Sequence, residues 1–263
     1  MSVSITGSRS ELGGVLAQRR TSSAIGKIHI NLAGQQANTL LHDGHAWEHF
    51  ARSARAGTRR AMHSARTGGA SMLVHASFAF VHAVERGVRL EEPLRSSVDA
   101  ILECEALALS GPVPACVVRL GYLYGPRSGD LRAYRTAFRL GRPYWSGPSR
   151  SLQYHVHQFD AAKALLAAAR PRLAGEIFYA TDGLAVSFMQ MMDAFARRVG
   201  RRTPLHLPLF TKHPARAIIR EEHMQQTALS MPRLAPTPRV PGWKPNFPDY
   251  RDGLDQVIES WGD

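Results

Sequence analysis

Hydrophobic and polar residues follow two different rhythms along the first half of the chain. Short apolar, β-branched runs are separated by longer stretches rich in alanine and arginine. The short runs predict strands at residues 3–6, 27–32, 71–77 and 115–120, and the longer stretches predict helices from about residue 10, at 45–66 and at 96–109. Strands that alternate with helices are typical of an α/β protein with a parallel sheet.

The pattern changes after Gly125, where prolines become frequent. Amphipathic helices are still predicted at residues 160–169 and 188–199, with a short strand at 176–180 between them and a closing helix at 250–261. We therefore expect a doubly wound core made of residues 1–125 plus about 150–182. A smaller C-terminal lobe takes about 126–149 and 183–263.

The composition indicates a chain that can bury a core. Of its 263 residues, 44% are hydrophobic and 21% are charged, which excludes wholesale disorder. The longest apolar runs, such as residues 112–120, are too short to cross a bilayer, and the polar start of the chain predicts no signal peptide. Because the only cysteines are Cys104 and Cys116, we expect reduced thiols and a cytoplasmic protein with no membrane partner.

An excess of arginine gives the chain a formal net charge of +12. The arginines are scattered along the sequence, and three interpretations are open: a solvated surface rich in arginine, attraction to a phosphate-bearing small molecule, and nucleic-acid binding. A nucleic-acid arm would concentrate its basic residues among aromatic ones. We therefore expect no nucleic-acid partner and favour the surface interpretation.

A glycine-containing turn joins the first predicted strand to the first predicted helix. It places Thr6, Gly7, Ser10 and Gly13 in the spacing Thr-Gly-x-x-Ser-x-x-Gly. Gly7 allows a tight backbone turn, and Gly13 allows the helix to approach the strand closely. The N-terminus of the helix would then offer its N–H groups to a pyrophosphate.

Five later segments carry further motifs: residues 28–34 (IHINLAG), 74–82 (VHASFAFVH), 118–126 (VRLGYLYGP), 157–162 (HQFDAA) and 241–254 (PGWKPNFPDYRDGL). With the turn, they resemble the extended short-chain dehydrogenases, the NAD-dependent epimerase/dehydratase family. The resemblance implies a Rossmann-like fold with a small substrate lobe, and a homodimer formed through the helices at 45–66 and 96–109. It also implies NAD or NADP as cofactor and a small-molecule substrate of the sugar-nucleotide or secondary-metabolite kind. The implied cofactor-binding residues are Thr6, Gly7, Ser10, Gly13, Leu32, Ala33 and Gly34.

The chain departs from the family at the Tyr-x-x-x-Lys pair, whose tyrosine is the acid/base and whose lysine lowers the pKa of that tyrosine. Alignment on residues 105–107 puts the tyrosine position at Ser97 and the lysine position at Ile101. No tyrosine lies between Gly34 and Tyr122, and no lysine lies between residues 27 and 163. A shift of the alignment therefore restores neither residue.

Two further catalytic positions of the family also carry other residues. The catalytic serine falls on Phe78, with Ser77 one place earlier, and the supporting asparagine falls on Ala54. No standard catalytic set is therefore intact. The residues left as candidates for proton transfer are Ser77, Ser97, His157 and Tyr122.

The segment between the first two predicted strands is also short for the family. Only 25 residues separate Thr6 from Leu32, where family members fit a helix, two strands and another helix. We expect the strand whose acidic tip would hold the adenosine ribose to be missing. The first helix must then move to the other sheet face, or the nucleotide cleft is rebuilt. Arg19 and Arg20 could meet a 2′-phosphate or could simply lie exposed at the end of the helix.

Histidines and aromatic residues supply other candidate sites. His45 and His49 match the inverted zincin pattern, and His42 adds a third ring that could hold zinc. A pattern of five residues arises readily by chance in a chain with 12 histidines, so we expect no metal. The aromatic residues expected to form a substrate wall between core and lobe are Tyr122, Tyr124, Tyr144 and Trp145.

Three functional hypotheses follow from these observations. The first is an NAD(P)-dependent oxidoreductase or epimerase with a non-standard acid/base. The second is a catalytically inactive family member that serves as a small-molecule sensor, scaffold or partner subunit. The third is a cofactor-independent cyclase or lyase, in which Ser77, His157 or a tyrosine of the cleft transfers the proton.

Overall fold

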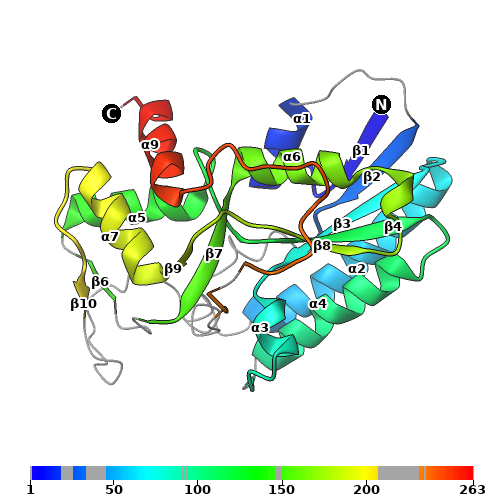
Figure 1. The fold of residues 1–263 in the computed structure, drawn as a ribbon, viewed down its shortest axis with the longest axis horizontal. Helices are drawn as coiled ribbons and strands as arrows, with labels where there is room; N and C mark the ends of the chain where they lie inside the picture. Colours follow the sequence, from blue (N-terminus) through cyan, green and yellow to red (C-terminus); the bar gives the residue numbers. More distant parts are fainter. Residues whose placement is uncertain are drawn as a thin grey trace.

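A five-stranded parallel sheet forms the centre of the larger part of the molecule (Figure 1). The computed structural model describes residues 2–18, 26–33, 46–90, 92, 94–141, 143–145, 150–206, 231–233 and 235–262. The strands lie in the order β1 (Ser2–Thr6), β2 (Lys27–Asn31), β3 (Met72–Phe78), β4 (Ala115–Leu120) and β8 (Ile177–Ala180). Every neighbouring pair is parallel. The predicted α/β fold class is confirmed.

Helices cover both faces of this sheet. On one face α1 (Glu11–Gln18) packs against α6 (Gln158–Ala168), and on the other α2 (Ala46–Thr67) packs against α4 (Leu94–Leu109). Figure 1 shows α1 and α6 above the strands and α2 and α4 below them. A short helix, α3 (Val81–Glu85), follows β3, and a single 3₁₀ turn, η2 (Pro171–Leu173), precedes β8.

The first two crossovers of the sheet have opposite hands. The steps from β1 to β2 and from β2 to β3 run in the same direction across the sheet. The helices between them, α1 and α2, nevertheless lie on opposite faces. Since nearly all such crossovers are right-handed, this arrangement is unusual. The first helix therefore keeps its place beside α6, and the hand of a crossover changes instead.

The alternation of residues in the strands explains why one sheet face is apolar and the other is not. Successive side chains of a strand point to opposite faces. In β2, Ile28 and Ile30 join the core against α1 and α6, while His29 and Asn31 point toward α2. Asn31 accordingly donates to Thr58 of α2.

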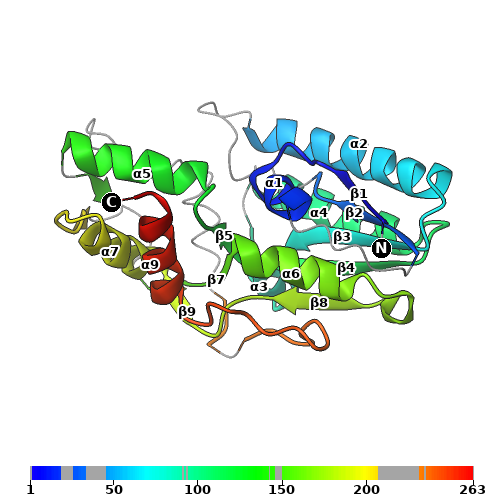
Figure 2. The ribbon, with the colours of Figure 1, turned by 90° about the horizontal axis from the view of Figure 1, so that it is seen from above.

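Beside the five-stranded sheet lies a second, smaller sheet, which carries the helices of the predicted C-terminal lobe. Its strands are β5 (Tyr122–Tyr124), β7 (Leu152–His157) and β9 (Ala185–Ser187), and a separate pair joins β6 (Tyr144–Trp145) to β10 (Leu205–His206). Its helices are α5 (Gly129–Leu140), α7 (Phe188–Arg198) and α9 (Tyr250–Ser260), which lie at the end of the molecule away from β1 (Figure 2). They share one apolar cluster around Tyr124, Phe138 and Phe195. In the described part of the chain, no helix is long and apolar enough to cross a membrane.

Candidate functional site

The glycine turn forms at the carboxyl end of β1, as its sequence predicts. Gly7 has a φ of +83°, a conformation that favours glycine. A Cβ atom on Gly13 would lie 2.5 Å from the Gly7 carbonyl oxygen and 2.7 Å from the backbone of Ser8. Both glycines are therefore needed, one for the turn and one for the close approach of α1.

The N-terminus of α1, which follows the turn, has backbone N–H groups available to bind a ligand. Ser10 is the N-cap, since its Oγ accepts from the Gly13 N–H at 3.0 Å. The N–H groups of Glu11 and Leu12 make no hydrogen bond within the residues that the structure describes. Two free donors at a helix N-terminus form an anion-binding site by geometry and by dipole.

The Glu11 side chain turns away from these donors toward the lobe. Its two oxygens accept from the Gly129 N–H at 2.7 Å and from Gln158 Nε2 at 3.0 Å. Burial raises the pKa of Glu11, and the bond from Gly129 partly offsets this. The residue thus ties α1 to the starts of α5 and α6.

A row of hydrogen-bonded polar side chains crosses the sheet face that α2 and α4 cover. His29 bonds through its ring nitrogens to Ser4 Oγ at 2.7 Å and to Thr6 Oγ1 at 2.8 Å. Asn31 Nδ2 bonds to His75 Nδ1 at 2.8 Å. The hydroxyl of Thr6, one of the predicted cofactor-binding residues, therefore takes part in this row.

A small pocket lies at the carboxyl ends of β3 and β4, the end of the strands at which the glycine turn also lies. Its cavity volume of about 10 Å³ has room for one water molecule, so a larger ligand must displace lining side chains. Strands lie about 4.8 Å apart, so these ends are about 10–15 Å from the end of β1. Ligands of open α/β sheets bind at this edge. The described residues that line the pocket are Phe78, Ala79, Phe80, Leu120, Gly121, Tyr122, Gln153, Tyr154 and Met231, and none of them carries a charge.

The positions that match the family's catalytic set lie in an apolar environment beside this pocket. Phe78 packs against Phe50 and Phe80, with ring centroids 6.1 and 5.4 Å apart. Ala54 and Ile101 are buried in the same cluster. Ser97 is fully buried in α4.

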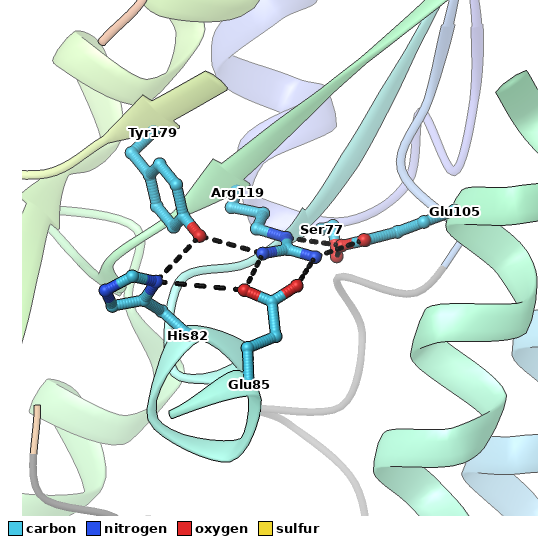
Figure 3. Close-up of polar contacts among 6 residues, drawn as sticks. All are labelled: Ser77, His82, Glu85, Glu105, Arg119 and Tyr179. Carbon is cyan, nitrogen blue, oxygen red and sulfur yellow. Dashed lines mark hydrogen bonds and ion pairs between the residues drawn. The ribbon is translucent and has the colours of Figure 1, made fainter. Parts of the chain in front are cut away.

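Ser77 lies in a buried ionic network around Arg119 (Figure 3). Its Oγ donates to Glu105 Oε1 at 2.5 Å. Arg119 uses all five of its N–H donors, toward Glu105, Glu85 and the Tyr179 hydroxyl, at distances of 2.7–2.9 Å. Burial opposes the charge of Arg119, but the bonds to the two glutamates raise its pKa above the usual value. The network holds β3, β4, β8, α3 and α4 together.

The predicted aromatic wall is divided between the pocket and the lobe. Tyr122 lines the pocket, and its hydroxyl donates to Asp130 Oδ2 at 2.9 Å. Burial and the Asp130 carboxylate raise the pKa of Tyr122. Tyr124 is fully buried under α9, where its hydroxyl contacts Gly253. The backbones of Tyr144 and Trp145 form β6, and their side chains lie outside the described residues.

His157 has both ring nitrogens bonded and lies away from the lining of the pocket. Its Nδ1 caps α6 by accepting from the Phe159 N–H at 3.3 Å, and its Nε2 bonds to Gln256 Oε1 at 3.1 Å.

Four other predicted site residues fall outside the described part of the chain: Gly34, His42, His45 and the side chain of His49. Among the described residues, no group of three or more metal-ligating side chains occurs.

Sequence reasoning missed three residues of the pocket wall. Phe80 follows β3, Tyr154 lies in β7, and Met231 comes from a segment distant in sequence. Tyr154 is buried, and its hydroxyl donates to the carbonyls of Pro232 and Arg233. Phe80 stands in the motif at residues 74–82, and Tyr154 begins a run, 154–157, that alternates like a strand. Met231 has no comparable signal in the sequence.

His155 gives the first prediction, which concerns pH. Its ring is buried among tyrosines, and burial lowers the pKa to about 4. Between pH 6.5 and 4 the unfolded chain takes up a proton that the folded chain refuses, so stability falls as pH drops through this window. We expect His155→Phe to remove about 3 kcal/mol of that loss.

Urea unfolding at several pH values between 4 and 7 measures this effect. His63→Gln is the matched control, because His63 is exposed on α2, and it should behave like the wild-type chain. Equal loss of stability on acidification in the wild-type chain and in His155→Phe would contradict the prediction.

Comparison with known proteins places the chain in a family. A 3-diazoavenalumate denitrifying reductase from a Streptomyces species is 32% identical over 226 residues, which cover 79% of this chain and 72% of that protein. The chain belongs to the extended short-chain dehydrogenase/reductase family. No protein-family model matches the sequence.

Solved structures of the same family share the fold. The human epimerase family protein SDR39U1 with NADPH is 16% identical with a TM-score of 0.68, and covers 98% of this chain and 99% of that one. The UDP-glucose 4-epimerase of Thermotoga maritima with UDP-glucose is 14% identical with a TM-score of 0.66, and covers 100% of this chain and 99% of that one. The predicted family and its Rossmann-like fold are thereby confirmed.

Proposed function

We propose that this chain is a reductase that uses NADH or NADPH to reduce a small aromatic substrate. The pocket at the carboxyl ends of β3 and β4 carries the proposal, since aromatic and apolar side chains line it. The glycine turn lies on the same sheet edge, so one extended molecule can reach both. The relative in Streptomyces is itself named as a reductase.

The turn fits the pyrophosphate of such a cofactor. The N–H groups of Glu11 and Leu12 supply donors, and side chains at Gly7 and Gly13 would fill the space that the backbone needs. The human epimerase family protein with the same fold was solved with NADPH. When bound, the cofactor would supply a hydride. The residues of this chain would hold the phosphates and leave the nicotinamide end directed along the strand ends toward the pocket.

The described lining of the pocket favours an aromatic substrate over a sugar nucleotide. A diphosphate is bound through cations or free N–H groups, and none of the described lining residues carries a charge. Phe78, Phe80 and Tyr154 instead offer faces and edges to a flat ring. We infer an aromatic substrate of the kind that the relative's name implies, an aryl diazo compound.

This substrate class also suits the missing Tyr-x-x-x-Lys pair. A carbonyl needs a proton donor as it receives hydride, but an aryl diazonium ion is already a cation. Hydride from the bound cofactor would add to its terminal nitrogen and give a neutral aryldiazene, Ar–N=N–H. The aryldiazene would lose its N–H proton to water and release N₂ as the aryl–nitrogen bond breaks, and the ring carbon would take a proton back from water. The sum is ArN₂⁺ + NAD(P)H → ArH + N₂ + NAD(P)⁺, and water rather than a protein acid carries the proton. The hydroxyl of Tyr122 donates its hydrogen bond to Asp130. In this proposal Tyr122 therefore packs against the substrate and transfers no proton.

Turnover assays test the proposal. The purified chain, NADPH and 4-carboxybenzenediazonium are mixed, and NADPH oxidation, N₂ release and benzoate formation are followed together. We expect equal amounts of all three above the rate without protein. A rate equal to that without protein, or NADPH oxidation without benzoate, would count against the proposal.

A variant of His157 separates this proposal from a cofactor-independent reaction. His157→Asn keeps an acceptor at the N-cap of α6 and removes the imidazole. Because His157 lies away from the lining of the pocket, we expect the NADPH-dependent rate to change by less than about twofold. Loss of the NADPH-dependent rate with an intact circular dichroism spectrum would show that the reductase needs the imidazole of His157. Turnover of the substrate without NADPH, lost in His157→Asn, would favour the cyclase or lyase hypothesis.

A further inference from the structure

The glycine turn follows β1, which is an edge strand of the sheet in the described part of the chain. β1 is the first strand in the order β1-β2-β3-β4-β8 and pairs with β2 alone among the described residues. In doubly wound dinucleotide sites, a strand on the outer side of β1 carries the residues that hold the adenosine. The described residues place no strand there.

The sequence between α1 and β2 leaves no room for such a strand. Only residues 19–26 join the end of α1 to the start of β2, and a crossover between parallel strands needs about a dozen residues. The register shows that β1 and β2 are direct neighbours, since Ser2 pairs with Lys27 and Thr6 with Asn31. The length of the connecting segment is therefore too small for a further strand and its own crossover to β2.

The acidic residue that would hold the adenosine ribose is also missing. In dinucleotide sites it follows the glycine turn by about 20 residues. This chain has no aspartate or glutamate between Glu11 and Asp43. At about that distance stands Lys27, already the first residue of β2.

The other half of the site is retained. Gly7, Ser10 and Gly13 form the phosphate turn. Ala33 follows β2 on the same edge, where its N–H is held by Asn31 Oδ1 at 3.0 Å, and it contacts Gly57 of α2. The pocket at the ends of β3 and β4 completes this side.

We infer that this chain has a nucleotide half-site, which binds the nicotinamide mononucleotide portion of the cofactor and gives the adenosine no binding free energy. This inference rests on the proposed function. Its ligand class is a nicotinamide mononucleotide, for which a complete dinucleotide is an equivalent substitute. A site with a strand on the outer side of β1 holds both the nicotinamide half and the adenosine half of the cofactor. Such a site binds the dinucleotide more tightly than the mononucleotide, whereas a half-site binds the two equally.

Binding measurements on the full chain test the half-site. Reduced nicotinamide mononucleotide, NADH and NADPH are titrated separately, by fluorescence and by calorimetry. We expect the three dissociation constants to agree within about threefold, and AMP at millimolar concentration to displace none of them. A dinucleotide that binds 30-fold or more tightly than the mononucleotide, by the same order-of-magnitude scale, overturns the half-site and leaves the proposed function standing. Failure of all three to bind overturns both.

Two aspartate substitutions show whether binding occurs at the turn. Ser10→Asp keeps a good N-cap and places a negative charge beside the phosphate. Ser64→Asp adds the same charge at an exposed position of α2 and is the matched control. We expect Ser10→Asp to weaken the mononucleotide and both dinucleotides equally, by about tenfold or more, and Ser64→Asp to bind like the wild-type chain. Unchanged binding in Ser10→Asp overturns the assignment.

Discussion

Replacing Arg119 with methionine should lower the free energy of unfolding by about 3–5 kcal/mol, because it leaves the buried Glu105 carboxylate without its cationic partner. Arg119 is 2% exposed and bonds to Glu105, which is equally enclosed, and to Glu85 at the edge of the network. Methionine has a similar length but no donor. The methionine variant therefore isolates the loss of the five hydrogen bonds and of the charge.

Urea unfolding followed by circular dichroism measures this loss. Arg55→Met is the matched control, since Arg55 pairs with Glu103 on the surface, where both side chains are more than one-third exposed. Such pairs contribute about 0–1 kcal/mol. If Arg119→Met and Arg55→Met shift the midpoint equally, the buried network does not stabilise the fold as described. Should Arg119→Met fail to fold, Glu105→Gln gives a milder form of the same test.

Adding one methyl group to Gly13 should damage the fold and the nucleotide site together. Its Cβ would meet backbone atoms of Gly7 and Ser8, which cannot move without changing the turn. We expect Gly13→Ala to cost about 1–3 kcal/mol of stability, as overpacking does. It should also weaken NADPH binding, because the turn positions the N–H groups of Glu11 and Leu12.

The neighbouring glycine offers the control for this substitution. A Cβ on Gly14 would meet only the end of the Arg127 side chain, which can move aside. Alanine at Gly14 should be neutral or stabilise the helix by up to about 1 kcal/mol. Thermal unfolding with and without NADPH measures both variants, and a Gly14→Ala variant that loses as much as Gly13→Ala would show that the turn is not tightly packed.

The regular elements of the core could be predicted from periodicity because their apolar faces are long. Each of the four strands predicted in the first half forms within a residue or two of its expected bounds. Helix α5 was not predicted, although residues 129–140 are amphipathic, since frequent prolines and glycines on either side suggested irregular structure. Its boundary depends on Ser128, whose Oγ caps it by accepting from Leu131 N.

The candidate site was only partly predictable, because it depends on contacts distant in sequence. The turn from Gly7 to Gly13 is local, so its geometry follows from its residues. The burial of Tyr124 is different, since it depends on Gly253 of α9, and no pattern around residue 124 shows this contact. Met231 likewise reaches the pocket from a segment without periodicity.

The handedness of the first crossover, from β1 through α1 to β2, could not be predicted from the sequence either. The short segment before Lys27 indicated that a strand was missing, and the order of the sheet agrees. The length of this segment left two alternatives open: α1 could move to the other face of the sheet, or the nucleotide cleft could be rebuilt. The structure keeps α1 against α6, where apolar residues of both helices share one core. Burial of Leu12, Val15 and Leu16 there outweighs the usual preference for a right-handed connection.

Titration of the chain with NADPH tests the central claim most directly, because both the reductase and its half-site require a nucleotide at the turn. We expect saturable binding with a dissociation constant on the order of 100 µM, as suits a site without adenosine contacts. Binding should weaken in Ser10→Asp and persist in Ser64→Asp. No saturable signal at millimolar NADPH, with a folded protein, would contradict the account.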